Sequence, residues 1–382
     1  MSYPWVRIKS GREKSIERFH PWVFSGSIDG AERELQEGEI VRLIDMNSGF
    51  LALGHCFEGS LAVKILSFKD EIIDQAWFDN RLENALERRK DIGLPSMRTN
   101  SFRLAHAEGD GLAGLIIDVY AGVAVVQPHS VGMEICLPEI TAALLKLGFE
   151  RIVHKPIDKS KPSILAGEVN GLVEVLENES LFLVDVIKGQ KTGFFLDQRD
   201  NRALLAQYSG GKNVLNVFSY TGGFSISALK GGAKTVWSLD SAQSALDIAD
   251  QNARLNKVDN KHTFIKADAL PYLQKMADKF DIIVLDPPAF AKHKSARHSA
   301  IQAYRRINEA AIGAINKGGL LFTFSCSQVV TQQMFYDTVA SAAINAKREV
   351  RVLHQLRQPA DHPVSLFHPE GEYLKGLVLS ID

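Results

Sequence analysis

A cysteine and an aspartate each close an apolar run typical of a buried strand. Cys326 ends the run in "LFTFSCSQ" (321–328), and Asp286 ends "DIIVLD" (281–286). A cysteine thiolate is accessible near neutral pH, is a strong nucleophile and leaves again readily. If it added to carbon 6 of a pyrimidine ring, carbon 5 could accept a methyl group, while Asp286 held the base edge and offset the charge on the ring. The alternative is that Cys326 is an inert, buried small hydrophobe.

Three successive strands of the predicted sheet end in an aspartate: Asp240, Asp268 and Asp286. In open α/β sheets, ligands bind beyond the carboxyl ends of the strands. Asp240 is placed to accept from the two hydroxyls of a ribose, and Asp268 from an adenine amino group. Each aspartate could instead cap a helix. Three in succession favour an adenosine-bearing cofactor.

The turns beside these aspartates have features that suit a cofactor and a planar base. In "NVFSYTGGFS" (216–225), two glycines, Gly222 and Gly223, allow the backbone to approach a ligand closely. The GxGxxG pattern that seats a pyrophosphate is absent, which disfavours a dinucleotide but not S-adenosylmethionine. Pro287 and Pro288 stiffen the loop after Asp286 and leave carbonyl groups free to accept from an exocyclic amine.

The elements that position these residues alternate between strand and helix. Apolar strands are expected at 213–218, 235–240, 262–268, 281–286 and 319–325, with a helical stretch at 298–317 before the last. Near-continuous apolar strands separated by helices predict a parallel sheet covered on both faces. The linker between two further strands, 349–356 and 373–381, is too short for a helical crossover, so these strands should pair antiparallel. This α/β plan is that of the class I (Rossmann-like) methyltransferases.

The preceding residues suggest two further domains. Short alternating runs up to about residue 72 predict a small β-barrel. A helix at 74–93, two strands joined by a turn at Ala121–Gly122, a helix at 134–147 and strands at 151–155, 172–177 and 181–187 predict a central α+β domain. We therefore expect domains at 1–72, 73–189 and 190–382.

A basic cluster near the N-terminus is either a solvated surface or an RNA-contacting one. It comprises Arg7, Lys9, Arg12, Lys14 and Arg18, with Trp5, Trp22 and Phe24 close by in sequence. Aromatic and basic side chains together favour single-stranded nucleic acid. Because the net charge of the chain is only −1, any RNA site must depend on such local grouping.

Composition excludes several classes. Cys56, Cys136 and Cys326 form no CxxC pair, which argues against a disulfide framework and a cysteine-rich metal centre. We expect no metal. The charged N-terminus lacks a signal-peptide core, and no run approaches the roughly 20 apolar residues of a membrane helix. A cytoplasmic protein without membrane partners is expected.

Several motifs resemble the RlmI-type family of bacterial ribosomal RNA large-subunit methyltransferases, which form 5-methylcytosine. They are "HPWVFSG" (20–26), "EGDGLAGLIIDVY" (108–120), "KTGFFLDQRDNR" (191–202), "VLNVFSYTGGFS" (214–225), "LDPPAFAK" (285–292), "FTFSCS" (322–327) and "ADHPV…PEGEYLKG" (360–376). The resemblance covers essentially the whole chain. The combination of "KTGFFLDQR" with "FSYTGGFS" is its most specific mark.

The resemblance implies an N-terminal RNA-binding PUA domain, S-adenosylmethionine as cofactor and large-subunit ribosomal RNA as substrate. Cys326 resembles the family nucleophile and Asp286 the residue that orients cytosine. The residues implied at the cofactor are Gln198 from a preceding strand or loop, Phe218, Ser219, Tyr220, Thr221 and Gly222 at the methionine end, Asp240 at the ribose and Asp268 at the adenine. Pro287, Pro288 and Phe290 would contact the base. Relatives often dimerise, which makes a homodimer a further expectation.

The chain departs from the family at Lys64, Ala113 and the segment 154–163, all outside the catalytic core. No second cysteine adjoins "DPPAF", so the base that removes the carbon-5 proton is unassigned. Three alternatives stay open. Methylation of an exocyclic amine would need no thiol and usually places an aromatic residue where Ala289 stands. The others are a nucleotide-dependent oxidoreductase and a catalytically silent RNA-binding protein.

Overall fold

The computed structural model describes residues 3–158, 160–277, 279–291 and 293–382. Lys159 and Lys292, which belong to the segment 154–163 and the "LDPPAFAK" motif, lie outside the described residues. The chain forms two compact units. The N-terminal unit comprises Met1–Val175, Val184–Phe194 and Ala360–Gly371, and the C-terminal unit comprises Leu176–Leu183, Phe195–Pro359 and Glu372–Asp382. The three-domain division at 72 and 189 stays a prediction.

A six-stranded sheet with the order β2-β6-β5-β4-β1-β3 opens the N-terminal unit. Its elements are β1 (Trp5–Ile8), α1 (Lys14–Glu17), β2 (Trp22–Phe24), η1 (Ser25–Ser27), β3 (Ile28–Ala31), β4 (Ile40–Ile44), β5 (Phe50–Cys56) and β6 (Leu61–Ser67). Neighbouring strands are antiparallel, except that β1 and β4 are parallel. Alternate residues of these strands, such as Val6, Ile8, Val41 and Leu43, fill its core.

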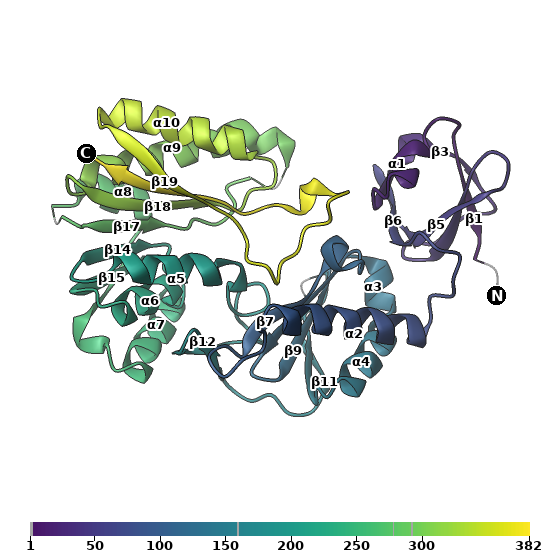
Figure 1. The fold of residues 1–382 in the computed structure, drawn as a ribbon, viewed down its shortest axis with the longest axis horizontal. Helices are drawn as coiled ribbons and strands as arrows, with labels where there is room; N and C mark the ends of the chain where they lie inside the picture. The colour runs from purple at the N-terminus through teal and green to yellow at the C-terminus, as the bar shows by residue number, and fades with distance from the viewer. Residues whose placement is uncertain (1–2, 159, 278, 292) are drawn as a thin grey trace. The chain divides into compact units, whose positions relative to one another are not determined.

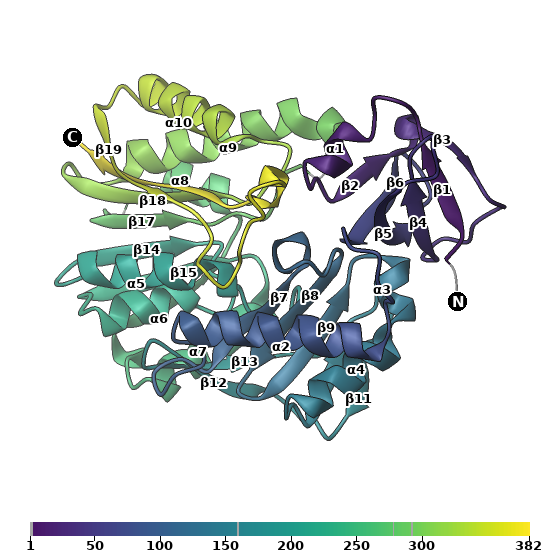
Figure 2. The ribbon, with the colours of Figure 1, turned by 45° about the vertical axis from the view of Figure 1, so that its right-hand side comes forward.

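A second sheet of this unit has five strands in the order β11-β10-β9-β8-β7. Its elements are α2 (Gln75–Asp91), β7 (Ser101–His106), η2 (Ala107–Asp110), β8 (Leu115–Tyr120), β9 (Val123–Pro128), α3 (Val131–Ile135), α4 (Leu137–Lys146), β10 (Arg151–His154) and β11 (Ser163–Ala166). Figure 2 shows the long helix α2 lying across β7, β8 and β9. The Asp74 carboxylate accepts from Trp77 N at 3.0 Å and caps this helix, and Trp77, Phe78 and Leu82 are buried beneath it.

The helix predicted at 74–93 and the turn at Ala121–Gly122 are confirmed, the turn with positive φ at both residues. The helix predicted around 134–147 is confirmed over Leu137–Lys146 (α4). Its first residues belong instead to the short helix α3, and Pro138, which cannot donate a backbone hydrogen bond, marks the start of α4. The strands β7 and β11 were not predicted. The strands β12 (Val173–Glu177) and β13 (Ser180–Val184) form a two-stranded sheet of their own.

The C-terminal unit contains a seven-stranded sheet with the order β16-β15-β14-β17-β18-β20-β19. Its first five strands are parallel, and β20 is antiparallel to both of its neighbours, as the sequence predicted. Helices α5, α6 and α7 cover one face, and α8, α9 and α10 cover the other (Figure 1). The bounds are η3 (Leu196–Gln198), α5 (Arg199–Tyr208), β14 (Asn213–Val217), α6 (Gly223–Lys230), β15 (Thr235–Asp240), α7 (Gln243–Leu255), η4 (Asp259–Lys261), β16 (His262–Lys266), α8 (Ala269–Lys275), β17 (Ile282–Leu285), η5 (Lys294–Ala296), α9 (Arg297–Ala314), β18 (Gly319–Ser325), α10 (Gln332–Ala346), β19 (Val350–Leu356) and β20 (Lys375–Ile381). The short helix η6 (Pro369–Gly371), between β19 and β20 in sequence, belongs to the N-terminal unit.

The segment between β19 and β20 is more than a hairpin loop, because Ala360–Gly371 belongs to the N-terminal unit. There the Asp361 carboxylate accepts from Arg103 N at 3.0 Å, and its carbonyl accepts from the buried Arg89 guanidinium at 2.7 Å. A Cβ on Gly109 would lie only 1.9 Å from the Pro363 carbonyl oxygen. The close approach of Gly109 and Pro363 brings the motifs "EGDGL" and "ADHPV" together in the structure. No helix in the described part of the chain is long and apolar enough to cross a membrane.

Candidate active site

The carboxyl edge of the seven-stranded sheet brings the two candidate catalytic residues together. Leu285 of β17 is the register partner of Thr323 of β18, so both strands end at the same edge. Asp286 follows β17 directly, and Cys326 follows β18 directly. The Cys326 thiol is half-buried and lies 4.0 Å from the Pro287 carbonyl oxygen. The topology therefore places a partly accessible thiol beside the proline loop.

The turn after β14 adopts a strained backbone conformation. Phe218 and Tyr220 have φ values of 62° and 48°, and Gly222 has a φ of 83°. Positive φ at non-glycine residues is rare, and such strain clusters at functional sites. A Cβ on Gly222 would also lie 3.2 Å from Ala249 Cβ, so this position favours glycine for both conformation and space.

Two buried hydroxyl groups of this turn suit a polar ligand. Ser219 Oγ and Thr221 Oγ1 are shielded from solvent and have no hydrogen-bonding partner among the described residues. An unsatisfied buried hydroxyl is unfavourable, so such groups usually receive a partner from outside the chain. The Tyr220 ring packs edge-on against Phe195 at 5.2 Å between centroids. This donor and acceptor set fits the charged methionine end of S-adenosylmethionine.

Asp240 and Asp268 occupy the ends of the next two strands in different ways. The Asp240 carboxylate accepts from Tyr220 N and from Ala242 N, both at 2.9 Å. It thereby joins two loops, and its remaining lone pairs can accept from ribose hydroxyls. The Asp268 side chain makes no capping hydrogen bond to α8, which it precedes. Asp268 instead lines an open pocket of about 470 Å³ together with Tyr272. The helix-cap alternative thus fails for Asp268.

Gln198 lies in η3 at the start of α5, not in a strand or loop as expected. Its side chain is buried, its amide Nε2 donates to Asp286 Oδ1 at 3.0 Å, and its Oε1 accepts from Asn201 Nδ2 at 2.6 Å. The observed contact of Gln198 is therefore with the candidate catalytic carboxylate. Sequence reasoning missed Asn201, although its spacing of three residues from Gln198 on a helix would have placed both on one face.

The residues behind Cys326 were also missed. The hydroxyls of Tyr304 and Ser327 are 3.0 Å apart, and burial raises the pKa of Tyr304. The Lys375 ammonium donates to the Ser327 carbonyl at 2.8 Å. The Phe290 ring packs against Tyr304 at 4.7 Å between centroids, so it forms part of the wall of the site. Of the two loop prolines, Pro287 is buried and Pro288 is exposed.

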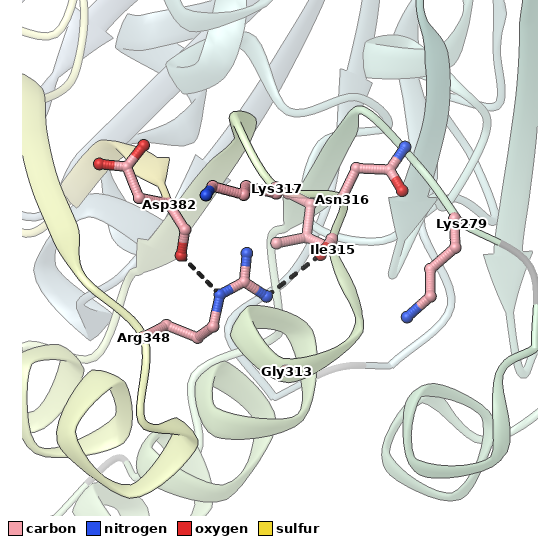
Figure 3. Close-up of a pocket in the computed structure, with 7 residues that line it drawn as sticks. All are labelled: Lys279, Gly313, Ile315, Asn316, Lys317, Arg348 and Asp382. Carbon is pink, nitrogen blue, oxygen red and sulfur yellow. Dashed lines mark hydrogen bonds between the residues drawn. The ribbon is translucent and has the colours of Figure 1, made fainter.

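A pocket at the opposite edge of the same sheet carries none of the predicted site residues (Figure 3). Arg348 donates to the Asp382 carbonyl at 2.8 Å and to the Ile315 carbonyl at 3.3 Å. These bonds anchor the end of β20. In the ranges that the structure describes, no three His, Cys, Asp or Glu side chains are grouped as a metal site would require.

The basic cluster of the N-terminal unit exposes most of its cations, but not all of the aromatic rings predicted to accompany them are open for stacking. Lys9, Arg12, Lys14 and Arg18 are exposed, and Arg7 stacks on the Trp5 ring at 4.7 Å. Phe24 is also exposed. Trp22 does not present its ring as an open stacking surface. Its indole N–H donates to Glu108 at 2.9 Å, and its ring packs on His368 at 4.3 Å.

Comparison with known proteins supports this architecture. A family model described as S-adenosylmethionine-dependent methyltransferase matches residues 147–366, and a model of a PUA-like domain matches residues 6–68. Ribosomal RNA large subunit methyltransferase I of Enterobacter sp. (strain 638) is 41% identical over 394 residues, with 98% of each chain covered. The protein of the same name from Aeromonas hydrophila is 41% identical over 392 residues, again with 98% of each covered.

Among solved structures, a protein from Streptococcus mutans described as a SAM-dependent methyltransferase matches with a TM-score of 0.87 at 23% identity, over 100% of both chains. A methyltransferase complexed with SAH matches with a TM-score of 0.88 at 24% identity, over the same shares. These two likenesses confirm the fold. The near full-length relatives and the two family models establish that the chain belongs to the family of ribosomal RNA large subunit methyltransferases and uses S-adenosylmethionine through a methyltransferase domain that follows a PUA-like domain.

Proposed function

We propose that the protein methylates carbon 5 of a cytosine in large-subunit ribosomal RNA, with Cys326 as the nucleophile. The observation that carries this proposal is the half-buried thiol at the carboxyl end of β18, beside the Asp286–Phe290 loop. The relatives that are 41% identical over 98% of the chain are named for ribosomal RNA of the large subunit, which supports the substrate.

The chemistry begins at the Cys326 thiolate. Its sulfur bonds to carbon 6 of cytosine, and the electron pair of the 5,6 double bond moves onto the ring, so that carbon 5 becomes nucleophilic. Carbon 5 would then take the methyl group that S-adenosylmethionine supplies when bound, with the sulfur–methyl bond breaking and S-adenosylhomocysteine as the leaving group. A base then removes the carbon-5 proton, the double bond forms again and the sulfur–carbon bond breaks, which returns the thiolate. The result is 5-methylcytosine.

Asp286 would hold the amino edge of cytosine and offset charge on the ring. The hydrogen bond from Gln198, itself held by Asn201, fixes the orientation of the Asp286 carboxylate. Pre-orientation of this kind matters because a small misplacement of a catalytic group slows the reaction strongly.

The cofactor would lie along the first three strand ends. Phe218, Ser219, Tyr220, Thr221 and Gly222 would hold its methionine end, where two buried hydroxyls have no partner within the described chain. The ribose hydroxyls would donate to Asp240, and the adenine amine to Asp268.

RNA would be recognised in part by the PUA-like domain. The exposed cations of its basic cluster can contact phosphates without reading sequence. Binding should therefore weaken steeply as salt is added. A target base inside structured RNA must also be splayed out, which takes a few kcal/mol of unstacking.

Methylation of an exocyclic amine is the competing reaction. It would use an aromatic ring after the two prolines to stack on the base. Ala289 occupies that position, and the following Phe290 packs on Tyr304. It would also leave the thiol at the end of β18 without a role. Both observations favour the carbon-5 reaction.

The test is methylation of unmodified large-subunit ribosomal RNA with S-adenosylmethionine, read as digested nucleosides by mass spectrometry. Wild type is compared with Cys326→Ala and with Cys136→Ala, a control that removes a buried thiol of the N-terminal unit. We expect 5-methylcytidine from wild type and the control, and none from Cys326→Ala. A methylated amine, or activity that survives Cys326→Ala, would overturn the proposal.

A further inference from the structure

A buried lysine stands beside the candidate nucleophile. Lys375 is the first residue of β20, and its register partner is Ser325, the last residue of β18. Its side chain crosses to the chain just beyond Cys326, where the ammonium donates to the Ser327 carbonyl at 2.8 Å. Lys375 thus contacts the residues on both sides of the cysteine. Only 7% of its surface is exposed.

A lysine so deeply buried requires an explanation, because removing an ammonium from water is unfavourable unless charge compensates it. Burial lowers the pKa of Lys375 to about 8. Negative charge on Cys326, and to a smaller extent on Glu372, raises this pKa and so opposes the effect of burial. The attraction between two groups is mutual. A thiolate that stabilises this ammonium is therefore itself stabilised by it.

Three other titratable groups of the described chain, on elements near this turn, do not supply a positive charge. Tyr304 of α9 is a buried phenol whose pKa is raised, so it is neutral at physiological pH. Asp286, on the loop after β17, brings negative charge, which would disfavour a thiolate. Glu372 precedes β20 and is also acidic. Unlike Tyr304, Asp286 and Glu372, Lys375 can act as a counter-cation for the thiolate.

We propose that Lys375 is a positioning residue that holds Cys326 as a thiolate and fixes the turn that presents it. This inference rests on the proposed role of Cys326 as nucleophile. The ammonium acts on the thiol, not on the substrate: the thiol proton passes to solvent, and the thiolate remains paired with the ammonium. The antiparallel direction of β20 makes this possible, since the strand begins where β18 ends.

The pH dependence of thiol alkylation tests the inference without RNA or cofactor. The full-length protein is treated with iodoacetamide over a range of pH, and modification of the Cys326 peptide is followed by mass spectrometry. We compare wild type, Lys375→Met, Lys375→Arg and Lys317→Met, the last removing an exposed lysine from the opposite edge of the sheet. The buried Cys136 peptide and the melting temperature report on the fold of each variant.

We expect the midpoint for alkylation of Cys326 to rise by about one pH unit in Lys375→Met, with about tenfold slower alkylation below the midpoint. Lys375→Arg should keep the midpoint near that of wild type, because it retains the charge, and Lys317→Met should not move it. An unshifted midpoint in folded Lys375→Met, or the same shift in Lys375→Arg, would overturn the inference.

Methylation of ribosomal RNA separates this inference from the proposed function. If Lys375→Met shifts the thiol midpoint but wild type forms no 5-methylcytidine, the lysine stabilises a thiolate and the proposed reaction is wrong. If wild type forms 5-methylcytidine in a Cys326-dependent way and the midpoint does not shift, the proposed function stands and the role of Lys375 is wrong.

Discussion

Removing one partner of the buried ion pair between Arg202 and Glu177 should strongly destabilise the C-terminal unit. The guanidinium of Arg202, on α5, donates to both oxygens of Glu177, at the end of β12, at 2.7 and 2.6 Å. Their side chains are 3% and 1% exposed. Arg202 also donates to the Phe195 carbonyl at 2.9 Å, and Phe195 packs on Tyr220 of the candidate cofactor turn.

Replacing Arg202 with Met should destabilise the protein by about 3–5 kcal/mol, because Glu177 is left buried without its cation. For a unit of this size, that corresponds to a melting temperature lower by about 10 °C. The substitution also removes the hydrogen bond to the Phe195 carbonyl, and Phe195 supports Tyr220 of the candidate cofactor turn. The affinity for S-adenosylhomocysteine should therefore fall as well. Differential scanning calorimetry measures the first effect, and titration calorimetry the second.

The double variant Glu177→Leu/Arg202→Met is the matched control. It removes both charges and leaves apolar groups of similar size, so it should melt well above Arg202→Met. Unchanged melting of Arg202→Met, or a double variant as unstable as the sum of the two single variants, would refute the argument from an uncompensated buried charge.

Three further outcomes are expected. Ser219→Ala should weaken binding of S-adenosylhomocysteine about fivefold in titration calorimetry without lowering the melting temperature, because its hydroxyl has no partner within the described chain. Gly109→Ala should destabilise the protein by about 1–3 kcal/mol in urea unfolding, since its Cβ would overlap the Pro363 carbonyl, whereas Gly30→Ala, with nothing within 4 Å, should be nearly neutral. Burial lowers the pKa of His55 to about 4 from 6.5, so its share of the stability is present above pH 6.5 and is lost as the pH falls toward 4. His55→Gln should therefore reduce the acid-induced loss of unfolding free energy by about 3 kcal/mol, and an unchanged pH profile would contradict this.

Local pattern was enough to predict the sheet of the C-terminal unit and the edge at which its functional side chains meet. Strand ends are visible in sequence because an apolar run stops at a polar residue, as it does at Asp240, Asp286 and Ser325. The short linker before β20 likewise required an antiparallel pair, which the structure confirms. The roles of these residues stay predictions.

What the sequence did not reveal depends on contacts between distant residues. The strands β7 and β11 were missed because their local signal is short: β7 alternates polar and apolar residues only over its first four positions, and β11 has four residues in all. Gln198 was expected in a strand or loop but lies in η3. Its hydrogen bond to Asp286 was not predicted either, because no local pattern reveals a contact with a residue 88 positions later. Asn201 and Tyr304 are buried on helices, where their type alone suggests only a satisfied core polar group.

Lys375 shows how the topology itself supplies a function that no motif records. In a wholly parallel sheet, every strand would begin at the amino edge, and the carboxyl edge would receive side chains only from the last residues of strands and from the loops that follow them. Because β20 runs antiparallel beside β18, its first residue lies at the carboxyl edge, opposite Ser325. A rigid strand, rather than a flexible loop, therefore delivers the cation to the turn that holds Cys326. A charge held in this way need not reorganise when the thiolate forms, and this is the condition under which electrostatic stabilisation is strongest.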